Sequence, residues 1–434
     1  MNEYDSNRIL DLVKPMGYVV TDKPSDADCY VLNTCHIREK ATDKVYHDIG
    51  RLKKEFRNKK KPMLLVTGCV AQAENEEMLS REKYIDGVVG PQSYHQIPGI
   101  IKKIENNKNK INSTEFEVIE KFDSLNLVRN SNSKISSFLT IQEGCDKFCH
   151  FCVVPYTRGP EHSRSLDEII IEAKQLINNG AKEITLLGQN VNAYEYKKKG
   201  ITFRLADLII TLNKIEELKR IRYTTSHPND VTKDLIAAHQ SCEKLMPILH
   251  LPVQSGSPKI LNAMNRKHNI LEYYKIIKDL KEAKPNIKFS SDFIIGYPGE
   301  TENDFNQTLD LIEKVKFINS YSFVYSSRPG TPASKLGHIN LETAKKRLTK
   351  LQAILERNNS IYKEGFLGKS TEVLFENKLD NQNKYFGRDK FLNSVIVYSE
   401  KSLTGKILDI KINAFNHNNL FGDILSNEKR NFAA

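Results

Sequence analysis

The amino-acid sequence predicts an α/β protein in three parts: an N-terminal parallel α/β domain, a partial (β/α)6 barrel and a small C-terminal all-β barrel. Strand and helix signals alternate up to about residue 125, which is typical of a parallel sheet covered by helices. Six further strands follow, each with a helix behind it, and six units are too few for a closed eight-unit barrel. The last 70 or so residues change to short β runs between Gly, Asn and Asp, which favours a small barrel.

The N-terminal domain is expected to start with a helix over 2–13. The other elements expected in it are strands over 28–33, 63–66 and 85–89 and helices over 37–56 and 74–80. Residues 102–114 are rich in Asn and Lys, so we interpret them as a loop or linker before extended chain over 116–128. The predicted domains span 1–115, 130–363 and 366–430.

The partial barrel is predicted from alternating apolar strands and amphipathic helices. Its strands are expected over 138–141, 183–187, 220–225, 247–251, 288–294 and 320–325, with helices over 165–179, 204–215, 230–239, 271–282 and 302–314. Ser165 and Glu168 form a capping-box pattern, and Gly180 is suited to end the same helix. A long charged helix over 341–362 precedes the β runs 371–376, 384–388, 394–398, 406–413 and 420–424.

The composition argues against a membrane-spanning protein, and the net charge has two interpretations. No stretch approaches the roughly 20 apolar residues of a membrane helix, and the polar segment 1–12 does not resemble a signal peptide. Seven cysteines cluster by motif and not in a disulfide pattern, which indicates a reducing cytoplasm. The net charge of +11 suits an RNA partner, but Lys and Asn are abundant throughout, so compositional drift explains it equally well.

Three cysteines within eight residues form the strongest chemical signal. Cys145, Cys149 and Cys152 have Cys-x3-Cys-x2-Cys spacing and directly follow the first predicted barrel strand. Thiolates select iron–sulfur clusters, zinc or copper(I), whereas structural zinc sites want four ligands, usually in paired knuckles. Three ligands on one compact loop favour a cubane cluster whose fourth iron stays open to a small molecule. The alternatives are a zinc knuckle with a distant fourth ligand and three core cysteines.

Two further cysteines follow neighbouring strands of the N-terminal domain. Cys35 follows the predicted strand 28–33, and Cys69 follows the strand 63–66. Because ligands of parallel α/β sheets bind beyond the carboxyl ends of the strands, we expect these two thiols to lie together in space. The alternative is two unrelated small residues at strand ends. Cys29, at a strand start, is expected to be plain core.

Six segments add a pattern beyond isolated residues: 1–6 (MNEYDS), 35–41 (CHIREKA), 90–95 (GPQSYH), 142–159, 251–257 (LPVQSGS) and 296–301 (GYPGET). Together they resemble the methylthiotransferase branch of the radical S-adenosylmethionine (SAM) enzymes, and within it the tRNA 2-methylthio-N6-isopentenyladenosine synthases. The resemblance covers essentially the whole chain. It implies a methylthiotransferase N-terminal domain, a radical SAM barrel and a C-terminal TRAM barrel.

The resemblance also implies the chemistry. A [4Fe–4S] cluster on Cys145, Cys149 and Cys152 would bind and cleave SAM to a 5′-deoxyadenosyl radical that takes hydrogen from C2 of adenine. Acid–base chemistry cannot activate that C–H bond, so a cofactor radical fits the task. A second [4Fe–4S] cluster would supply sulfur, and a second SAM the methyl group. The substrate would be tRNA with N6-isopentenyladenosine at position 37, 3′ of the anticodon. A reducing electron donor protein, no membrane, a cytoplasmic location and a monomeric state are also expected.

The auxiliary cluster is where this sequence departs from the family pattern. Cys35 and Cys69 match its second and third ligands, whereas the first lies in a Gly-Cys-Gln stretch ahead of the Met-Asn at which this sequence begins. The first strand of the α/β domain is missing as well. We expect that the chain starts at an internal methionine. In the alternative, the ligand is truly lost and the auxiliary cluster damaged, and His36 or Cys29 could substitute.

Residues on barrel loops are the candidates for holding SAM. Gln189, Ser226, Gln254 and Asp292 are expected at strand ends, where polar groups can bind the ribose and the methionyl moiety. Such residues also cap helices or satisfy loop backbone. Arg158 and Arg164 could contact the SAM carboxylate or tRNA phosphate, or pair with Glu161 and Asp167.

Two other functions stay open from the sequence. One is a methylthiotransferase that acts on threonylcarbamoyladenosine in tRNA or on a ribosomal protein. The segments 1–6 and 90–95 argue against it, because these versions are peculiar to the isopentenyl branch. The other is an inactive iron–sulfur RNA-binding protein, which would follow from loss of the first auxiliary-cluster cysteine.

Overall fold

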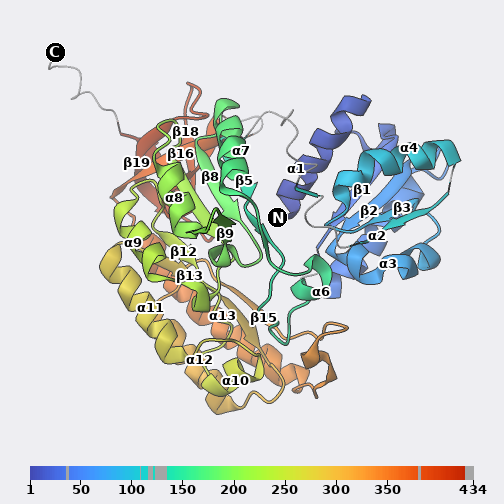
Figure 1. The fold of residues 1–434 in the computed structure, drawn as a ribbon. Helices are drawn as coiled ribbons and strands as arrows, with labels where there is room; N and C mark the ends of the chain where they lie inside the picture. Colours follow the sequence, from blue (N-terminus) through green and yellow to red (C-terminus); the bar gives the residue numbers. More distant parts are fainter. Residues whose placement is uncertain (36–38, 108, 116–120, 123–133, 380–382, 426–434) are drawn as a thin grey trace.

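The computed structural model describes residues 1–35, 39–107, 109–115, 121–122, 134–379 and 383–425. Figure 1 shows an N-terminal α/β layer on one side, a curved array of strands and helices on the other, and a small β-barrel beyond that array. The α/β class with a small C-terminal barrel, predicted from the sequence, is therefore confirmed. No helix in the described part of the chain is both long and apolar enough to cross a bilayer.

The N-terminal sheet is parallel, with its four strands in chain order. They are β1 (Cys29–Thr34), β2 (Met63–Gly68), β3 (Gly87–Val89) and β4 (Ile111–Ser113). Successive residues of β2 serve opposite faces, as strand geometry requires. Leu65 packs with α1 (Asn2–Val13) and α4 (Ile97–Asn107), whereas Leu64 and Val66 pack with α2 (Glu39–Glu55) and α3 (Cys69–Arg81).

One prediction in this domain is wrong. Residues 102–114, expected as a loop, contain the second half of α4 and the strand β4. The apolar spacing that builds α4 begins earlier, at Ile97, Ile100, Ile101 and Ile104, which places one apolar stripe on the sheet. Lys102, Lys103 and Asn106 are exposed to solvent on the opposite side of the helix. The extended chain expected over 116–128 lies largely outside the described residues.

The second body is a partial parallel barrel built from six strand positions. Its strands are β5 (Ser136–Thr140), β8 (Glu183–Leu187), β11 (Arg220–Thr224), β12 (Ile248–His250), β13 (Lys288–Ser290) with β14 (Asp292–Ile295), and β15 (Tyr321–Val324). The expected single strand 288–294 changes neighbour at Ser291, so that β13 pairs with β12 and β14 with β15. No pairing among the described strands joins β5 to β15, which leaves the barrel open.

Helices cover the outer face of the barrel and close one continuous apolar core. They are α7 (Leu166–Asn178), α8 (Leu205–Asn213), α9 (Lys233–Ser241), α10 (Pro258–Ala263), α11 (Ile270–Ala283) and α12 (Glu302–Val315). The Ser165 hydroxyl accepts a hydrogen bond from the Glu168 amide, as the N-cap pattern predicts. The hairpin of β9 (Glu195–Lys198) and β10 (Ile201–Arg204) was not predicted; its turn, Lys199–Gly200, has positive φ at both residues.

The helix α13 (Leu341–Glu364) leads into a closed five-stranded barrel. Its strands are β16 (Ser370–Lys378), β17 (Lys384–Asp389), β18 (Ser394–Tyr398), β19 (Ile407–Phe415) and β20 (Asn419–Ile424). Two buried arginines at the start of β11 attach it to the larger barrel. Arg222 donates to the carbonyls of Asp389 and Lys390 at 2.9 and 3.0 Å, and Arg220 donates to the Arg388 carbonyl at 2.7 Å.

Candidate active site

The three-cysteine loop leaves the barrel where its first strand ends. It follows β5 and the short strand β6 (Gln142–Glu143), and it ends at the one-turn helix α6 (Val154–Arg158). The Cys145 amide donates to the Gly159 carbonyl at 3.2 Å, and the Cys152 amide donates to the Cys149 carbonyl at 2.9 Å. Cys149 is buried, and Cys145 and Cys152 are half-buried. In Figure 1, α6 lies between the N-terminal sheet and the large barrel.

A buried glutamine ties this loop to the end of the neighbouring strand. The Gln142 amide nitrogen donates to the Gly144 carbonyl at 2.8 Å, and its Oε1 accepts from the backbone amides of Gln189 and Asn190 at 3.0 and 3.1 Å. In return, the Gln189 side chain accepts from the Gly144 amide at 2.7 Å. The start of the cysteine loop is therefore fixed against β8.

The far side of the loop is held by the segment that follows α10. The His150 amide donates to the Met264 carbonyl at 3.0 Å, and the Asn265 side chain donates to the Phe148 carbonyl at 2.9 Å. Arg266 is anchored by a 2.6 Å bond to the Pro252 carbonyl, and its other terminal nitrogen lies 3.5 Å from the Cys149 sulfur. The Arg266 guanidinium therefore donates a hydrogen bond to the sulfur of Cys149.

Burial changes the acidity of two thiols in this loop. It raises the pKa of Cys145 to about 12 and that of Cys152 to about 11, with the neighbouring cysteines adding to both shifts. A metal centre that binds them as thiolates must therefore displace their protons. Among the described residues, no three side chains of His, Cys, Asp or Glu are gathered around a single metal-ion position.

Several buried polar atoms near the loop have no hydrogen-bond partner in the described part of the chain. They are Asn190 Oδ1, Ser226 Oγ, His227 Nε2, Arg266 Nε and both ring nitrogens of His268. The rings of His227 and His268 are 5.7 Å apart. Burial, reinforced by the Arg266 charge, lowers the pKa of His268 to about 3 and that of His227 further, so both rings are neutral. Unpaired buried polar groups are costly, and a polar ligand would satisfy them.

The N-terminal cysteines lie at one edge of their sheet. β1 and β2 are adjacent and parallel, with Thr34 paired to Gly68, so Cys35 and Cys69 follow paired positions. Gly68 has φ 94°, and a Cβ there would lie 2.2 Å from the Thr34 carbonyl, so these strand ends approach closely. Cys69 begins α3, which packs on α6, and it is near enough to Cys152 and Arg158 to influence the pKa of both. The packing of α3 on α6 therefore brings Cys69 toward the cysteine loop of the large barrel.

Comparison with known proteins decides the family. Residues 139–312 match the model of the radical SAM superfamily, and residues 1–90 match the model described as uncharacterized protein family UPF0004. The chain is 57% identical over 433 residues to the tRNA-2-methylthio-N(6)-dimethylallyladenosine synthase of Pelagibacter ubique, covering 100% of this chain and 97% of that protein. It is 49% identical over 426 residues to the synthase of the same name from Wolbachia pipientis, covering 97% of each.

The chain belongs to the tRNA-2-methylthio-N(6)-dimethylallyladenosine synthase family. Its fold is also similar to a solved radical SAM methyltransferase, TsrM from Kitasatospora setae, with a TM-score of 0.58. That match has 12% identity and covers 76% of this chain and 74% of the other, so it bears on the fold alone.

The four SAM candidates predicted from the sequence have different surroundings, and their roles stay predictions. Ser226, after β11, is buried with its hydroxyl unpaired. Gln254, after β12, has φ 76° and exchanges backbone hydrogen bonds with β14. Asp292 begins β14, two residues after β13 ends, and its carboxylate lies 3.6 Å from the ring of His250, the last residue of β12. The Gln189 side chain is already engaged by Gly144.

The two arginines after the cysteines pair with other groups than those expected. Arg158 contacts Asp5 at 2.8 Å and Glu143 at 3.6 Å, and Arg164 contacts Glu172 at 2.7 Å. Burial disfavours the Arg158 charge, but Asp5 and the other acidic groups raise its pKa above the usual value. Both side chains are buried, so they hold elements together and do not face a phosphate. The expected pairing of these arginines with Glu161 and Asp167 is therefore wrong.

Sequence reasoning missed Arg266, His268 and Asn265 as parts of the site. They lie on the segment after α10, about 120 residues from the cysteines, and no spacing pattern connects the two segments. Asn190 and His227 were located after strands, but no role was predicted for them. His36, a candidate substitute ligand, lies outside the described residues, and Cys29 is half-buried at the start of β1.

Proposed function

We propose that this protein inserts a methylthio group at C2 of N6-isopentenyladenosine in tRNA, at position 37 beside the anticodon. The observation that carries the proposal is the loop of Cys145, Cys149 and Cys152 at the carboxyl end of the first barrel strand, in a chain of the synthase family. Loops after barrel strands are where such folds place their chemistry.

The residues of the loop fit a [4Fe–4S] cluster with SAM on its open iron. Three soft donors are offered by one backbone segment, and unpaired polar atoms of Ser226, His227 and His268 lie nearby to receive a polar ligand. When bound, the cluster and SAM supply the electron and the hydrogen-abstracting radical, and SAM also supplies the methyl group. The chain's own residues position these groups: Gln142 and Gln189 fix the start of the loop, and Arg266 and Asn265 fix its middle.

We also propose that Cys35 and Cys69 bind an auxiliary [4Fe–4S] cluster that supplies the sulfur. Their positions after paired strands, and the proximity of Cys69 to Cys152, support it, because sulfur must reach the same substrate carbon as the radical. The predicted first ligand, ahead of Met1, stays a prediction. A protein electron donor, a monomeric state and a cytoplasmic location complete the proposal.

The test is product analysis on loaded enzyme. After anaerobic reconstitution, the protein is incubated with SAM, a reductant and tRNA that carries N6-isopentenyladenosine, and nucleosides are quantified by mass spectrometry. We expect the 2-methylthio nucleoside, and none from tRNA with unmodified adenosine or from the Cys145→Ala variant. Product from threonylcarbamoyladenosine instead would contradict the proposed substrate.

Iron content tests the auxiliary cluster separately. Two cubane clusters correspond to about eight irons per chain and one to about four. We expect Cys35→Ala and Cys69→Ala each to lose about four irons, while the cluster on Cys145, Cys149 and Cys152 keeps its spectrum. Equal iron in the two variants and the unchanged protein would show that these cysteines do not hold a cluster.

A further inference from the structure

We propose that Phe148 and Tyr156 form a platform on which an unpaired base of the RNA substrate stacks, an inference that rests on the proposed function. Both side chains are large, aromatic and exposed, at 50% and 46% of their maximum. Their ring centroids are 6.3 Å apart, and the rings meet edge to face at 81°. One face of each ring is therefore available to a base, since the pair does not stack on itself.

The pair sits where a substrate base must come. Phe148 lies immediately before Cys149 in the cysteine loop, and Tyr156 is in α6, four residues after Cys152. Because α6 packs on α3, whose first residue is Cys69, the platform also borders the proposed auxiliary site. A base taken out of an RNA loop for reaction near these cysteines would pass over the two rings.

The backbone at Phe148 is held in an unusual conformation. Its φ is 48°, in the left-handed region that bulky residues seldom adopt because it strains the backbone. The Asn265 side chain holds that conformation by donating to the Phe148 carbonyl at 2.9 Å. The structure therefore maintains a strained residue whose result is an aromatic ring in solvent. Single exposed apolar residues are common, but strain combined with exposure beside a reactive loop is not explained by packing.

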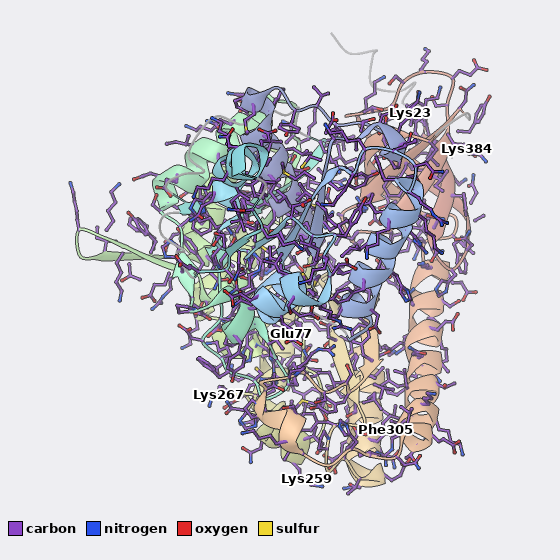
Figure 2. The ribbon with its side chains drawn as sticks, turned by 90° about the vertical axis from the view of Figure 1, so that its right-hand side faces the viewer. Lys23, Glu77, Lys259, Lys267, Phe305 and Lys384 are labelled. Atoms are coloured by element: carbon purple, nitrogen blue, oxygen red, sulfur yellow. The ribbon has the colours of Figure 1, made fainter. Side chains whose placement is uncertain are left out.

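A positive charge next to the platform suits an RNA partner, whose phosphates are negative. Lys267 is exposed, and its ammonium donates to Asn265 Oδ1 at 2.7 Å, so the same side chain that holds Phe148 also positions a cation. Figure 2 shows Lys267 at the lower-left edge of the molecule in that view. Aromatic rings that stack bases beside basic groups that contact phosphate are the recurring arrangement of single-stranded RNA sites.

The experiment measures RNA affinity of the anaerobically loaded enzyme. The probe is a fluorescent anticodon stem-loop RNA that carries N6-isopentenyladenosine, and binding is followed by anisotropy. Phe148→Asn removes the ring but tolerates positive φ, Tyr156→Ala removes the other ring, and Tyr156→Phe keeps it. We expect the first two variants to lose affinity about 5- to 100-fold, and Tyr156→Phe to bind as the unchanged protein does. Lys267→Gln should reduce the slope of log K against log salt concentration by about one, as the loss of one phosphate contact predicts.

The matched control is Tyr321→Ala. Tyr321 is 60% exposed but begins β15, at the opposite end of the barrel strands, so its loss should leave affinity unchanged. The iron content of each variant shows whether the cluster loop is intact. If Phe148→Asn loses iron, the RNA affinity of Tyr156→Ala tests the platform instead. Unchanged affinity in both ring variants, or an equal loss in Tyr321→Ala, overturns the platform and leaves the proposed function standing. No RNA binding by the unchanged protein would overturn both.

Discussion

Gly144 has almost no room for a side chain. Its φ is 75°, and a Cβ would lie 1.8 Å from the Pro160 carbonyl oxygen, which is backbone and cannot rotate away. We therefore predict that Gly144→Ala displaces the chain on one side of the cysteine loop and prevents Cys145 from joining the other two thiols. The expected result is loss of at least half of the iron bound at this loop, measured after anaerobic reconstitution together with the visible absorbance of the cluster.

Gly180→Ala is the control that separates the effect of the steric clash from the cost of the positive φ angle. It also has positive φ, 106°, but nothing lies within 4 Å of the Cβ position. Gly180→Ala should cost about 1 kcal/mol of stability and leave iron content unchanged. Full iron binding by Gly144→Ala would mean that the loop can shift without losing its geometry, and the prediction would be wrong.

Arg266 is predicted to tune the proposed cluster through Cys149. Hydrogen bonds and positive charges near the sulfurs stabilise the reduced cluster, and the Arg266 guanidinium offers both at 3.5 Å from Cys149 Sγ. Arg266→Met should shift the midpoint potential to more negative values, measured by potentiometric titration with EPR detection, whereas Arg266→Lys should recover part of the shift. The neighbouring Lys267→Met is the control, since Lys267 bonds Asn265 and no sulfur. Equal midpoint potentials in all variants would show that Arg266 does not tune the cluster.

At the scale of elements, sequence patterns predicted what depends on local spacing. The helix over 2–13 and the strand over 394–398 have the predicted bounds, because apolar period and turn residues agree in each. The helix α4 was missed because its apolar stripe starts before the Asn- and Lys-rich stretch by which the segment was judged. The hairpin β9–β10 is polar and mostly exposed, so its sequence lacks the apolar alternation that would predict two strands.

The candidate site was predictable only on the side that carries the motif. Cysteine spacing and strand order located Cys145, Cys149 and Cys152 after the first barrel strand, and Cys35 and Cys69 at one sheet edge. Which side chains surround them depends on how distant elements pack. The contact between Arg266 and Cys149 joins residues 117 positions apart. Such pairings are set by tertiary packing, which local spacing does not encode.

The link between β6 and β8 is predicted to depend on the Gln142 side chain. Leucine is of similar size but has no polar atoms, so Gln142→Leu would leave the buried amides of Gln189 and Asn190 without their acceptor. We expect a loss of about 2–5 kcal/mol in the free energy of unfolding, measured by denaturant titration of the iron-free chain. Gln240→Leu, at an exposed position near the end of α9, should cost less than about 0.5 kcal/mol. Similar losses in both variants would contradict the prediction.

Ion pairs connect the three bodies of the molecule. Arg158 joins α1 of the N-terminal domain, through Asp5, to β6 of the large barrel, through Glu143. Lys121 pairs with the same Glu143 at 2.5 Å, and burial lowers the pKa of Lys121. At the C-terminal barrel, Arg220 of β11 pairs with Glu372 of β16 at 2.9 Å, while Arg222 pairs with Glu183 inside the large barrel at 2.9 Å. The pairs of Arg158 with Asp5 and of Arg220 with Glu372 each cross a contact between two bodies, and they therefore favour one relative orientation.

Arg158 lies at the seam between the two proposed cluster sites, where α6 of the large barrel packs on α3. Arg158→Met keeps the length of the side chain but leaves Asp5 without its partner and Glu143 with Lys121 alone in a buried setting. Removing one member of a buried pair typically costs about 3–5 kcal/mol. We expect that loss in the first unfolding transition of the iron-free chain, followed by circular dichroism.

Arg204→Met is the control, because Arg204 is exposed and lies 4.0 Å from Glu195, a surface pair that contributes at most about 1 kcal/mol. The seam has a second expected consequence, since α3, which begins at Cys69, packs there on α6, which follows Cys152. If the N-terminal domain loosens, Arg158→Met should keep the iron at both sites and yet make less methylthio product per cleaved SAM. If the yield of methylthio product per cleaved SAM is unchanged while stability falls, Arg158 supports the fold and not the approach of the two sites.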